Sequence, residues 1–466
     1  MIEFILNNKK ITTDASKSMT LVDFIRHNSN LKGTKIVCQE GDCGACTVLI
    51  GELLDGNIKY HSITSCISPL ANAHGKHVVT VEGLNLDKQL NKVQQSLKNN
   101  HASQCGFCTP GFVIAMINYC LNNNTNTDQQ MLDAISGNIC RCTGYVAIIN
   151  SARELVESSK SQGKKYTIRQ LIQYNFIPAY FADIPQQLAQ LNQNNTNMAE
   201  KIIAGGTDLY VQQAQKLLQT KSLRFIILEQ SAPIEISNNI CSISATATVS
   251  DMFFNHELNN AIANWQQYLR LVSSEAIRNM ATIAGNFVNA SPIGDMSIIM
   301  LALKAKLHLQ TKDTGRTITL KKFFIDYKKV ALNADESISR IEFNIPDGHC
   351  FNFEKVSKRT HLDIATVNTA IHIQLDNNEI TEINIAMGGV AAIPKYLTKT
   401  CKYLQGRHIN PKTLRLAIKV MHKEIAPISD IRGTATYKRL LAEQLFKAHF
   451  IKLFPQQITF NQVVNI

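Results

Sequence analysis

Cysteine spacing limits the fold of this chain more than any other feature of its sequence. The stretch CQEGDCGAC places Cys38, Cys43 and Cys46 in a C-x4-C-x2-C pattern, and Cys66 follows in SITSCISP. Plant-type ferredoxins use this spacing to hold a two-iron cluster. The interleaved glycines permit the positive φ values and the close backbone approach that such a loop needs. The pattern predicts an iron–sulfur loop, and a zinc loop or buried free cysteines are the alternatives.

A second cysteine group is ambiguous when it is taken alone. QCGFCTPG contains Cys105 and Cys108, and GNICRCTGY contains Cys140 and Cys142. C-x2-C pairs occur in both zinc and iron–sulfur sites, although a distant C-x-C pair is unlike the second half of a zinc ribbon. Each pair precedes a predicted helix, where the positive end of the helix dipole stabilises an anionic centre. This placement favours a thiolate-bound cluster and leaves zinc open.

Length and composition predict a soluble protein of several domains. A chain of 466 residues is too long for one hydrophobic core, so about three or four domains are expected. The start, MIEFILNNKK, lacks the pattern of a signal peptide, and no apolar segment reaches the ~20 residues that span a bilayer. We therefore expect a cytoplasmic protein without membrane association, whose thiols stay reduced. The net charge of +12 comes from scattered lysine pairs without an interleaved aromatic motif, so no nucleic-acid binding is expected.

The apolar pattern predicts a multidomain α+β chain. Residues 1–78 are expected to form a ferredoxin-like unit: IEFILNNKKIT reads as two strands around an Asn7-Asn8 turn, TLVDFIRHN as a helix capped by Thr20, and CTVLI, NIKYHSI and HVVTVEG as further strands. Residues 79–157 predict a helical bundle, with one helix capped by Thr109 and opened by Pro110. Residues 158–169 have linker composition, and 170–345 and 346–466 mix strands with helices.

Two glycine-containing loops lie within residues 170–345. KIIAGGTDLYVQQAQ reads as a strand, a Gly-Gly turn and a helix start, which would offer backbone N–H groups to a diphosphate. It is not a G-x-G-x-x-G motif, so a Rossmann fold is not indicated. The second loop, RNMATIAGNFVNASPIGD, is rich in small and hydrogen-bonding residues. Its Asp295 could accept hydrogen bonds from ribose hydroxyls, or it could cap the helix MSIIMLALK.

The three cysteine motifs together resemble the two-cluster module of the molybdenum hydroxylase family, whose members include xanthine dehydrogenase and aldehyde oxidase. The resemblance covers about residues 1–155 and implies a β-grasp first domain and a helical-bundle second domain. It also implies that Gln104 contacts the pterin of a molybdenum cofactor carried by another chain. The residues that it assigns to two 2Fe-2S clusters are Cys38, Cys43, Cys46, Cys66, Cys105, Cys108, Cys140 and Cys142.

The glycine loops resemble the FAD domain of the same family, over about residues 170–460. This implies an α+β FAD-binding domain in 170–345 and a C-terminal α+β flavoprotein domain, marked by MGGVAAIPK, in 346–466. Ala284 stands where the family often has glycine, and Val272 where it often has an aromatic residue. The positions that match the flavin site are Ile202, Ile203, Ala204, Gly205, Gly206, Thr207, Asp208, Ala281, Thr282, Gly285, Asn286, Asn289, Gly294, Asp295 and Lys355.

The sequence leaves no room for the molybdenum-binding region of this family, so that region is expected on a separate large subunit. The resemblance implies a heterodimer that assembles further. Electrons would pass from the partner's molybdenum to the Cys105 group, the Cys38 group, FAD and NAD, and no general base is expected here. A related hydroxylase of aldehydes, aromatics or heterocycles would use the same route. A stand-alone flavin reductase gives the eight cysteines no role, and a zinc-stabilised, basic nucleic-acid-binding protein is the alternative of another class.

Overall fold

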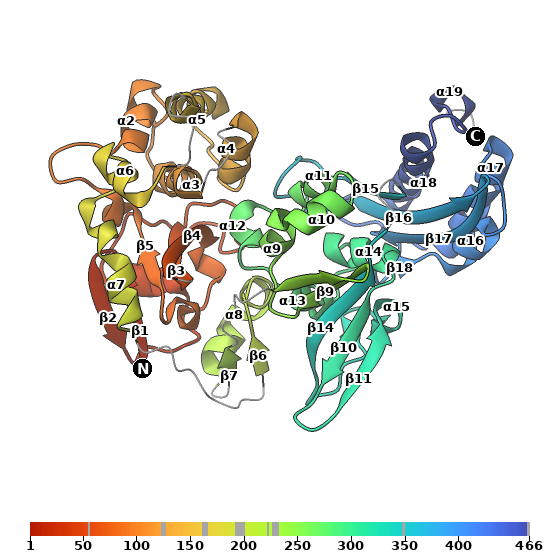
Figure 1. Ribbon diagram of the computed structural model, residues 1–466, viewed down its shortest axis with the longest axis horizontal. Coiled ribbons are helices and arrows are strands. Elements are labelled where there is room, and N and C mark those ends of the chain that lie inside the picture. Colours follow the sequence, from red (N-terminus) through yellow and green to blue (C-terminus); the bar gives the residue numbers. More distant parts are fainter. Residues whose placement is uncertain are drawn as a thin grey trace. The chain divides into compact units, whose positions relative to one another are not determined.

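The computed structural model describes residues 1–54, 56–122, 127–160, 166–191, 201–220, 223–225, 233–346 and 350–463. These residues form two compact units (Figure 1). Their mixed α and β structure is what the sequence predicts. The first unit comprises Met1–Gln230 and Ser274–Ala281, and the second comprises Ser231–Ser273 and Thr282–Ile466. No helix in the described ranges is both long and apolar enough to cross a membrane.

The first unit begins with the predicted ferredoxin-like sheet. Its strands lie in the order β2-β1-β5-β3-β4, in which β1 and β5 are parallel and the other pairs are antiparallel. Asn7 takes a positive φ of 55° in the first turn, and the Thr20 side chain accepts from the Asp23 N–H at the helix start. The bounds are β1 Ile2–Leu6, β2 Lys9–Thr13, α1 Leu21–Asp23, η1 Phe24–Asn28, β3 Thr47–Leu54, β4 Asn57–Thr64, η2 Ser65–Ile67, η3 Leu70–Ala73, β5 His77–Val79 and η4 Val81–Leu84.

A bundle of helices follows the sheet, also as predicted (Figure 1). Its central helix is α3, in which every residue from Gly111 to Leu121 is buried, because the neighbouring helices and the sheet cover it on all sides. This helix begins at Thr109 itself, one residue before the predicted start. The predicted linker includes residues 161–165, which lie outside the described residues. The bounds are α2 Lys92–Asn99, α3 Thr109–Asn122, α4 Asp128–Ile135, α5 Tyr145–Lys160, α6 Ile168–Gln173, η5 Ala179–Ala182 and α7 Ile184–Ala189.

Two segments from later in the chain complete the first unit. Parallel strands β6 (Lys201–Ile203) and β7 (Leu223–Phe225) flank helix α8 (Leu209–Gln219). The short helix α12 (Glu275–Arg278) packs against both the sheet and the bundle. Its neighbour Asn279 donates from Nδ2 to the Ser62 carbonyl oxygen at 2.8 Å, and Glu275 Oε1 accepts from Asn118 Nδ2 at 2.7 Å. Residues 274–281 therefore bind the first unit through buried polar contacts.

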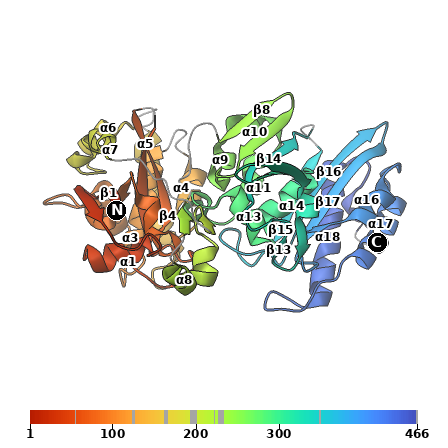
Figure 2. The same ribbon diagram turned by 90° about the horizontal axis from the view of Figure 1, so that it is seen from below.

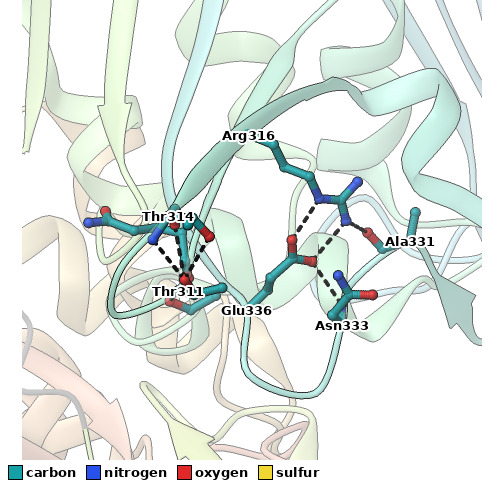
Figure 3. A network of polar contacts seen from close by, with 8 residues as sticks. Thr311, Thr314, Arg316, Ala331, Asn333 and Glu336 are labelled. Atoms are coloured by element: carbon teal, nitrogen blue, oxygen red, sulfur yellow. Dashed lines mark hydrogen bonds and ion pairs between the residues drawn. The ribbon is translucent and has the colours of Figure 1, made fainter.

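The second unit contains an antiparallel sheet in the order β11-β10-β14-β9-β8. Arg316 in β11 makes paired hydrogen bonds to Glu336, from Nε to Oε1 at 2.6 Å and from Nη2 to Oε2 at 2.8 Å (Figure 3). These bonds fix the loop before β14 and lower the pKa of Glu336 to about 2. The bounds are β8 Ile234–Ser237, β9 Ile240–Ser244, α9 Val249–Phe254, α10 His256–Ala261, α11 Trp265–Arg270, α13 Ile283–Asn289, α14 Asp295–Ala302, β10 Lys306–Gln310, β11 Gly315–Thr319, α15 Leu320–Phe323, β12 Phe324–Asp326, β13 Lys329–Val330 and β14 Ser337–Asn344.

A second antiparallel sheet, in the order β15-β16-β17-β18, completes this unit. Helix α18 packs along β15 and β16 (Figure 2), and α14 packs on β16 and β17. Along β16, Ile371 and Ile373 join the core formed with α16–α18, whereas Asn368 turns to the α14 side. The bounds are β15 Phe351–Val356, β16 Val367–Asp376, β17 Glu379–Gly388, β18 Lys395–Tyr396, α16 Thr398–Leu404, α17 Pro411–Glu424, α18 Ala435–Leu453 and α19 Phe460–Val463.

Candidate functional site

The four cysteines of the first group come from two places: the open end of the β3–β4 hairpin and the loop that precedes β3. Cys46 directly precedes β3 and Cys66 lies in η2 directly after β4, so strand pairing brings them together. Ser65 strengthens this junction, because its N–H and its hydroxyl both donate to the Cys46 carbonyl oxygen, at 3.3 and 2.5 Å. The loop that carries Cys38 and Cys43 turns at Gly41 and Gly44, which take positive φ values of 79° and 68°. The prediction that these two glycines take positive φ values is thus confirmed.

The sulfurs of this group interact pair by pair. Cys38 interacts with Cys43 and with Cys66, and Cys46 interacts with Cys66. Hydrogen bonding with Cys43 holds the pKa of Cys38 well below the usual thiol range, and contact with Cys66 lowers the pKa of Cys46. The same contacts raise the pKa values of Cys43 and Cys66. These opposite shifts have one cause: four thiolates cannot share this space without a cation, so the charge on one sulfur opposes ionisation of its neighbours.

Backbone N–H groups also point at these sulfurs. The Glu40 N–H donates to Cys38 Sγ at 3.5 Å. The backbone amides of Ala45 and Gly41 act to lower the pKa values of Cys43 and Cys66, respectively, against the larger effects that raise them. Among the described residues, no group of three or more His, Cys, Asp or Glu side chains has the arrangement that would hold a single metal ion. The cysteines meet instead as sulfur pairs surrounded by amide donors. That donor set fits a cationic two-iron core, which binds four thiolates over two irons.

The second cysteine group lies at two helix starts, as the sequence predicts. Cys108 directly precedes α3, and Cys142 comes three residues before α5 begins at Tyr145. A hydrogen bond of 3.5 Å joins the sulfurs of Cys142 and Cys105, and Cys108 interacts with Cys140. The contact with Cys105 lowers the pKa of Cys142 to about 6, whereas burial raises that of Cys108 to about 12. Paired sulfurs at positive helix ends suit a second anionic cluster.

The two cysteine groups differ in exposure. Cys105 and Cys142 are exposed, while Cys46 and Cys66 are buried. Gln104, which is predicted to touch a pterin, is exposed beside Cys105. Of the four cysteines outside the two groups, Cys120, Cys241 and Cys401 are buried and Cys350 is partly buried.

Direct backbone contact joins the two groups. The Ile139 N–H donates to the Cys43 carbonyl oxygen at 3.0 Å, and Asn138 Nδ2 donates to the Gly44 carbonyl oxygen at 3.0 Å. A Cβ atom on Gly111 would overlap with that Gly44 oxygen. No local sequence pattern indicates this junction, since it joins residues that are about 95 positions apart along the chain.

The first predicted flavin loop lies in the first unit. Ile202 and Ile203 are in β6, Gly206 takes a positive φ of 78°, and α8 begins after Asp208. A Cβ atom on Gly205 would overlap with the Met280 carbonyl oxygen, so this close approach requires glycine. Asp208 makes no side-chain cap to α8, which leaves backbone N–H groups at the helix start available for an anion. Ala204 accepts from Asn72 Nδ2 through its carbonyl oxygen at 3.3 Å.

The second predicted flavin loop begins with Ala281 in the first unit and continues through the second unit. Thr282 caps α13 by accepting from the Gly285 N–H at 3.2 Å. Asn286 accepts from the Ser297 hydroxyl at 3.3 Å. Lys328 donates to the carbonyl oxygen of Asn289 at 2.9 Å, at the C-terminal end of the helix. A short capped helix thus presents the small residues of this loop.

A buried ion pair lies where the second loop meets β15. Lys355 Nζ is 2.7 Å from Asp295 Oδ2 and 2.7 Å from the Leu271 carbonyl oxygen. Asn368 donates from Nδ2 to Asp295 Oδ1 at 2.5 Å. The alternative prediction that Asp295 caps α14 is wrong, since Gly294 is the N-cap and Asp295 makes no cap. The sequence analysis did not predict that Asp295 contacts Lys355 and Asn368. An asparagine inside the apolar strand VNTAIHIQL could have indicated a buried polar contact there.

Four protein families match this chain. Residues 4–71 match the 2Fe-2S iron-sulfur cluster binding domain, and residues 80–153 match the [2Fe-2S] binding domain. Residues 174–346 match the FAD binding domain in molybdopterin dehydrogenase, and residues 353–453 match the CO dehydrogenase flavoprotein C-terminal domain. With the geometry above, these matches define an oxidoreductase chain with two 2Fe-2S domains and an FAD-binding domain.

Some relatives match nearly the whole of this chain. The chain is 28% identical to xanthine dehydrogenase of Emericella nidulans, over 96% of this chain and 38% of that protein. It is 27% identical to xanthine dehydrogenase 1 of Arabidopsis thaliana, over 96% of this chain and 39% of that protein. Together, the domain matches and these relatives are consistent with the iron–sulfur and flavin domains of a molybdenum hydroxylase. The chain thus spans well under half the length of these relatives.

Solved structures show the same fold. Carbon monoxide dehydrogenase from Hydrogenophaga pseudoflava superimposes with a TM-score of 0.51 and 21% identity, over 59% of this chain and 94% of that chain. CO dehydrogenase from Oligotropha carboxidovorans superimposes with a TM-score of 0.50 and 22% identity, over 54% of this chain and 89% of that chain. At these identities the likeness concerns the fold alone.

Proposed function

We propose that this chain is the electron-transfer component of a molybdenum hydroxylase whose molybdenum cofactor is carried by a separate large subunit. In this route, electrons enter at the Cys105 group, pass to the Cys38 group and the FAD domain, and leave on NAD. Clusters supply one-electron carriers when bound, and FAD converts single electrons into a hydride. The part played by this chain is to hold these groups at fixed separations and to bind the partner.

The observation that carries the proposal is the hydrogen bond between the two cysteine loops. The Ile139 N–H donates to the Cys43 carbonyl oxygen at 3.0 Å, and Ile139 directly precedes Cys140. One hydrogen bond therefore joins a ligand residue of the first group to the residue that directly precedes a ligand of the second. Electron tunnelling falls steeply with distance, so such a junction favours transfer between two clusters. A metal site that only stabilises a fold needs no second site beside it.

The surroundings of the second group support its place at the entry of the route. Cys105 and Cys142 are exposed, and three large apolar side chains beside them are also exposed: Phe107, Tyr145 and Val146. An exposed cluster rimmed by apolar side chains is what a partner subunit would cover. Gln104 is exposed in the same loop, where it could reach a pterin held by that partner.

Xanthine, or hypoxanthine, is the proposed substrate of the whole enzyme, which would form urate in purine catabolism. Support comes from the relatives that match 95–96% of this chain, which are named xanthine dehydrogenases. A hydroxylase of aldehydes, aromatics or heterocycles is the alternative, because the domains of this chain serve any substrate of the large subunit. Substrate choice belongs to that subunit.

Capture of the tagged chain with its partner tests this proposal. The complex should contain molybdenum and should reduce NAD with xanthine. Val146, at 76% exposed, offers a variant: Val146→Asp should abolish capture of the molybdenum subunit while the chain keeps its iron. Ile431→Asp, at a side chain that is 88% exposed in the second unit, is the matched control and should keep the partner. A complex that oxidises an aldehyde but not xanthine supports the alternative, and capture without molybdenum contradicts both.

A further inference from the structure

Three buried hydroxyl groups lack a hydrogen-bond partner within the described ranges, and all three lie close to the first cysteine group. They belong to Thr34, Thr64 and Ser68, within four positions of Cys38 or Cys66. Buried hydroxyls in folded proteins are almost always paired, because an unpaired one forfeits its bonds to water. Each of them therefore needs a partner that the described protein atoms do not supply.

Ser68 has a simple partner within reach. It lines a small enclosed cavity that offers about 30 Å³ to the centres of water molecules, which is enough for a water. Glu52, His61 and Lys76 line the same cavity and supply polar neighbours. A water bound in this cavity would satisfy the Ser68 hydroxyl.

Thr64 has different surroundings. It is 1% exposed, and the residues around the Ser68 cavity do not include it. Its hydroxyl oxygen lies 3.4 Å from where a Cβ on Gly41 would stand, so it faces the cysteine loop. Gly41 belongs to the loop between Cys38 and Cys43, and its backbone amide acts on the Cys66 thiol. Across the hairpin, Thr64 pairs with Thr47, whose hydroxyl reaches the same loop by donating to the Gly44 carbonyl oxygen at 2.6 Å.

We infer that the Thr64 hydroxyl donates a hydrogen bond to a sulfur of the first cluster and raises its reduction potential. This inference rests on the proposed iron–sulfur ligation by the first cysteine group. A reduced cluster carries one more negative charge, which its sulfurs share, so each donor binds the reduced form more strongly. Thr64 would then act as a positioning and tuning residue that makes this cluster a better electron acceptor.

Potentiometric titration with electron paramagnetic resonance tests the inference. Thr64→Val keeps the shape of the side chain and removes the donor. Its first cluster should be harder to reduce by about fivefold in the reduction equilibrium, or ~40 mV for one electron. Thr64→Ser restores a hydroxyl and should return the potential to the wild-type value. Ser68→Ala, which loses a buried hydroxyl from the same region, should leave it unchanged. The signal that disappears in Cys66→Ala identifies the first cluster.

Each outcome has one meaning. Equal potentials in wild type and Thr64→Val overturn the inference, as do equal shifts in Thr64→Val and Thr64→Ser. If Thr64→Val does not accumulate with iron, Thr64→Ala takes its place, and pulsed resonance of the wild type in D₂O should detect an exchangeable side-chain proton at the first cluster. Absence of that proton also overturns the inference. A wild-type protein without iron contradicts the proposed function instead.

Discussion

Replacing Gly111 by alanine tests whether the two cysteine loops depend on direct backbone contact. A Cβ atom at position 111 would lie 2.8 Å from Asn138 Nδ2 and would overlap with the Gly44 carbonyl oxygen. Since a backbone oxygen cannot rotate away, the loops must separate by about 1 Å to reach ordinary van der Waals distances. Such overpacking costs about 1–3 kcal/mol, and loss of the Asn138–Gly44 hydrogen bond adds about 1 kcal/mol. Alanine offsets about 1 kcal/mol through its better helix propensity.

The expected net loss for Gly111→Ala is about 1–3 kcal/mol in the free energy of unfolding. Denaturant titration followed by cluster absorbance measures it, and the magnetic interaction between the two reduced clusters reports their separation. Asn138→Ala is the control, because it removes the hydrogen bond without overlap and should cost only about 1 kcal/mol. Wild-type stability together with an unchanged magnetic interaction in Gly111→Ala would refute the reasoning.

Two further predictions concern buried polar groups. Asn368→Ala removes a donor to the Asp295 carboxylate that pairs with Lys355, so we expect a loss of about 1.5–3 kcal/mol in stability and weaker FAD retention in flavin analysis; unchanged values in both would contradict it. Burial lowers the pKa values of His77 and His449 to about 3, below the usual value of about 6.5. Both are neutral when folded, so stability should fall as pH drops from about 6.5 towards 3, by up to about 1.4 kcal/mol per unit for each. Urea titrations across this range measure the slope, which should be shallower in His449→Gln; an equal slope would contradict the assignment.

Local chemistry explains which features the sequence could predict. The turn at Asn7, the cap at Thr20 and the positive φ values of Gly41 and Gly44 all depend on a few neighbouring residues. The starts of α3 and α5 were also predictable, because Pro110 and the apolar pattern after Tyr145 mark them. Because these helix starts were predictable, so was the position of the cysteine pairs directly before them.

Long-range contacts account for what the sequence could not predict. Asp295 binds Lys355 and Asn368, which lie 60 and 73 positions away along the chain. Local sequence patterns suggested instead that Asp295 caps a helix, and this cap does not form. Helix α12 lies in the predicted FAD region, yet it packs with the first unit through Glu275. Thr64 is an ordinary strand residue in the sequence, and only the fold places its hydroxyl against the cysteine loop.

An anaerobic reductive titration of the purified chain, with iron and flavin analysis, tests the central claim most directly. The account predicts about four irons per FAD, two distinct 2Fe-2S resonance signals and the uptake of about four electrons, one for each cluster and two for the flavin. Zinc in place of iron, with no flavin, would contradict it. A single 2Fe-2S signal would contradict the assignment of the Cys105 group.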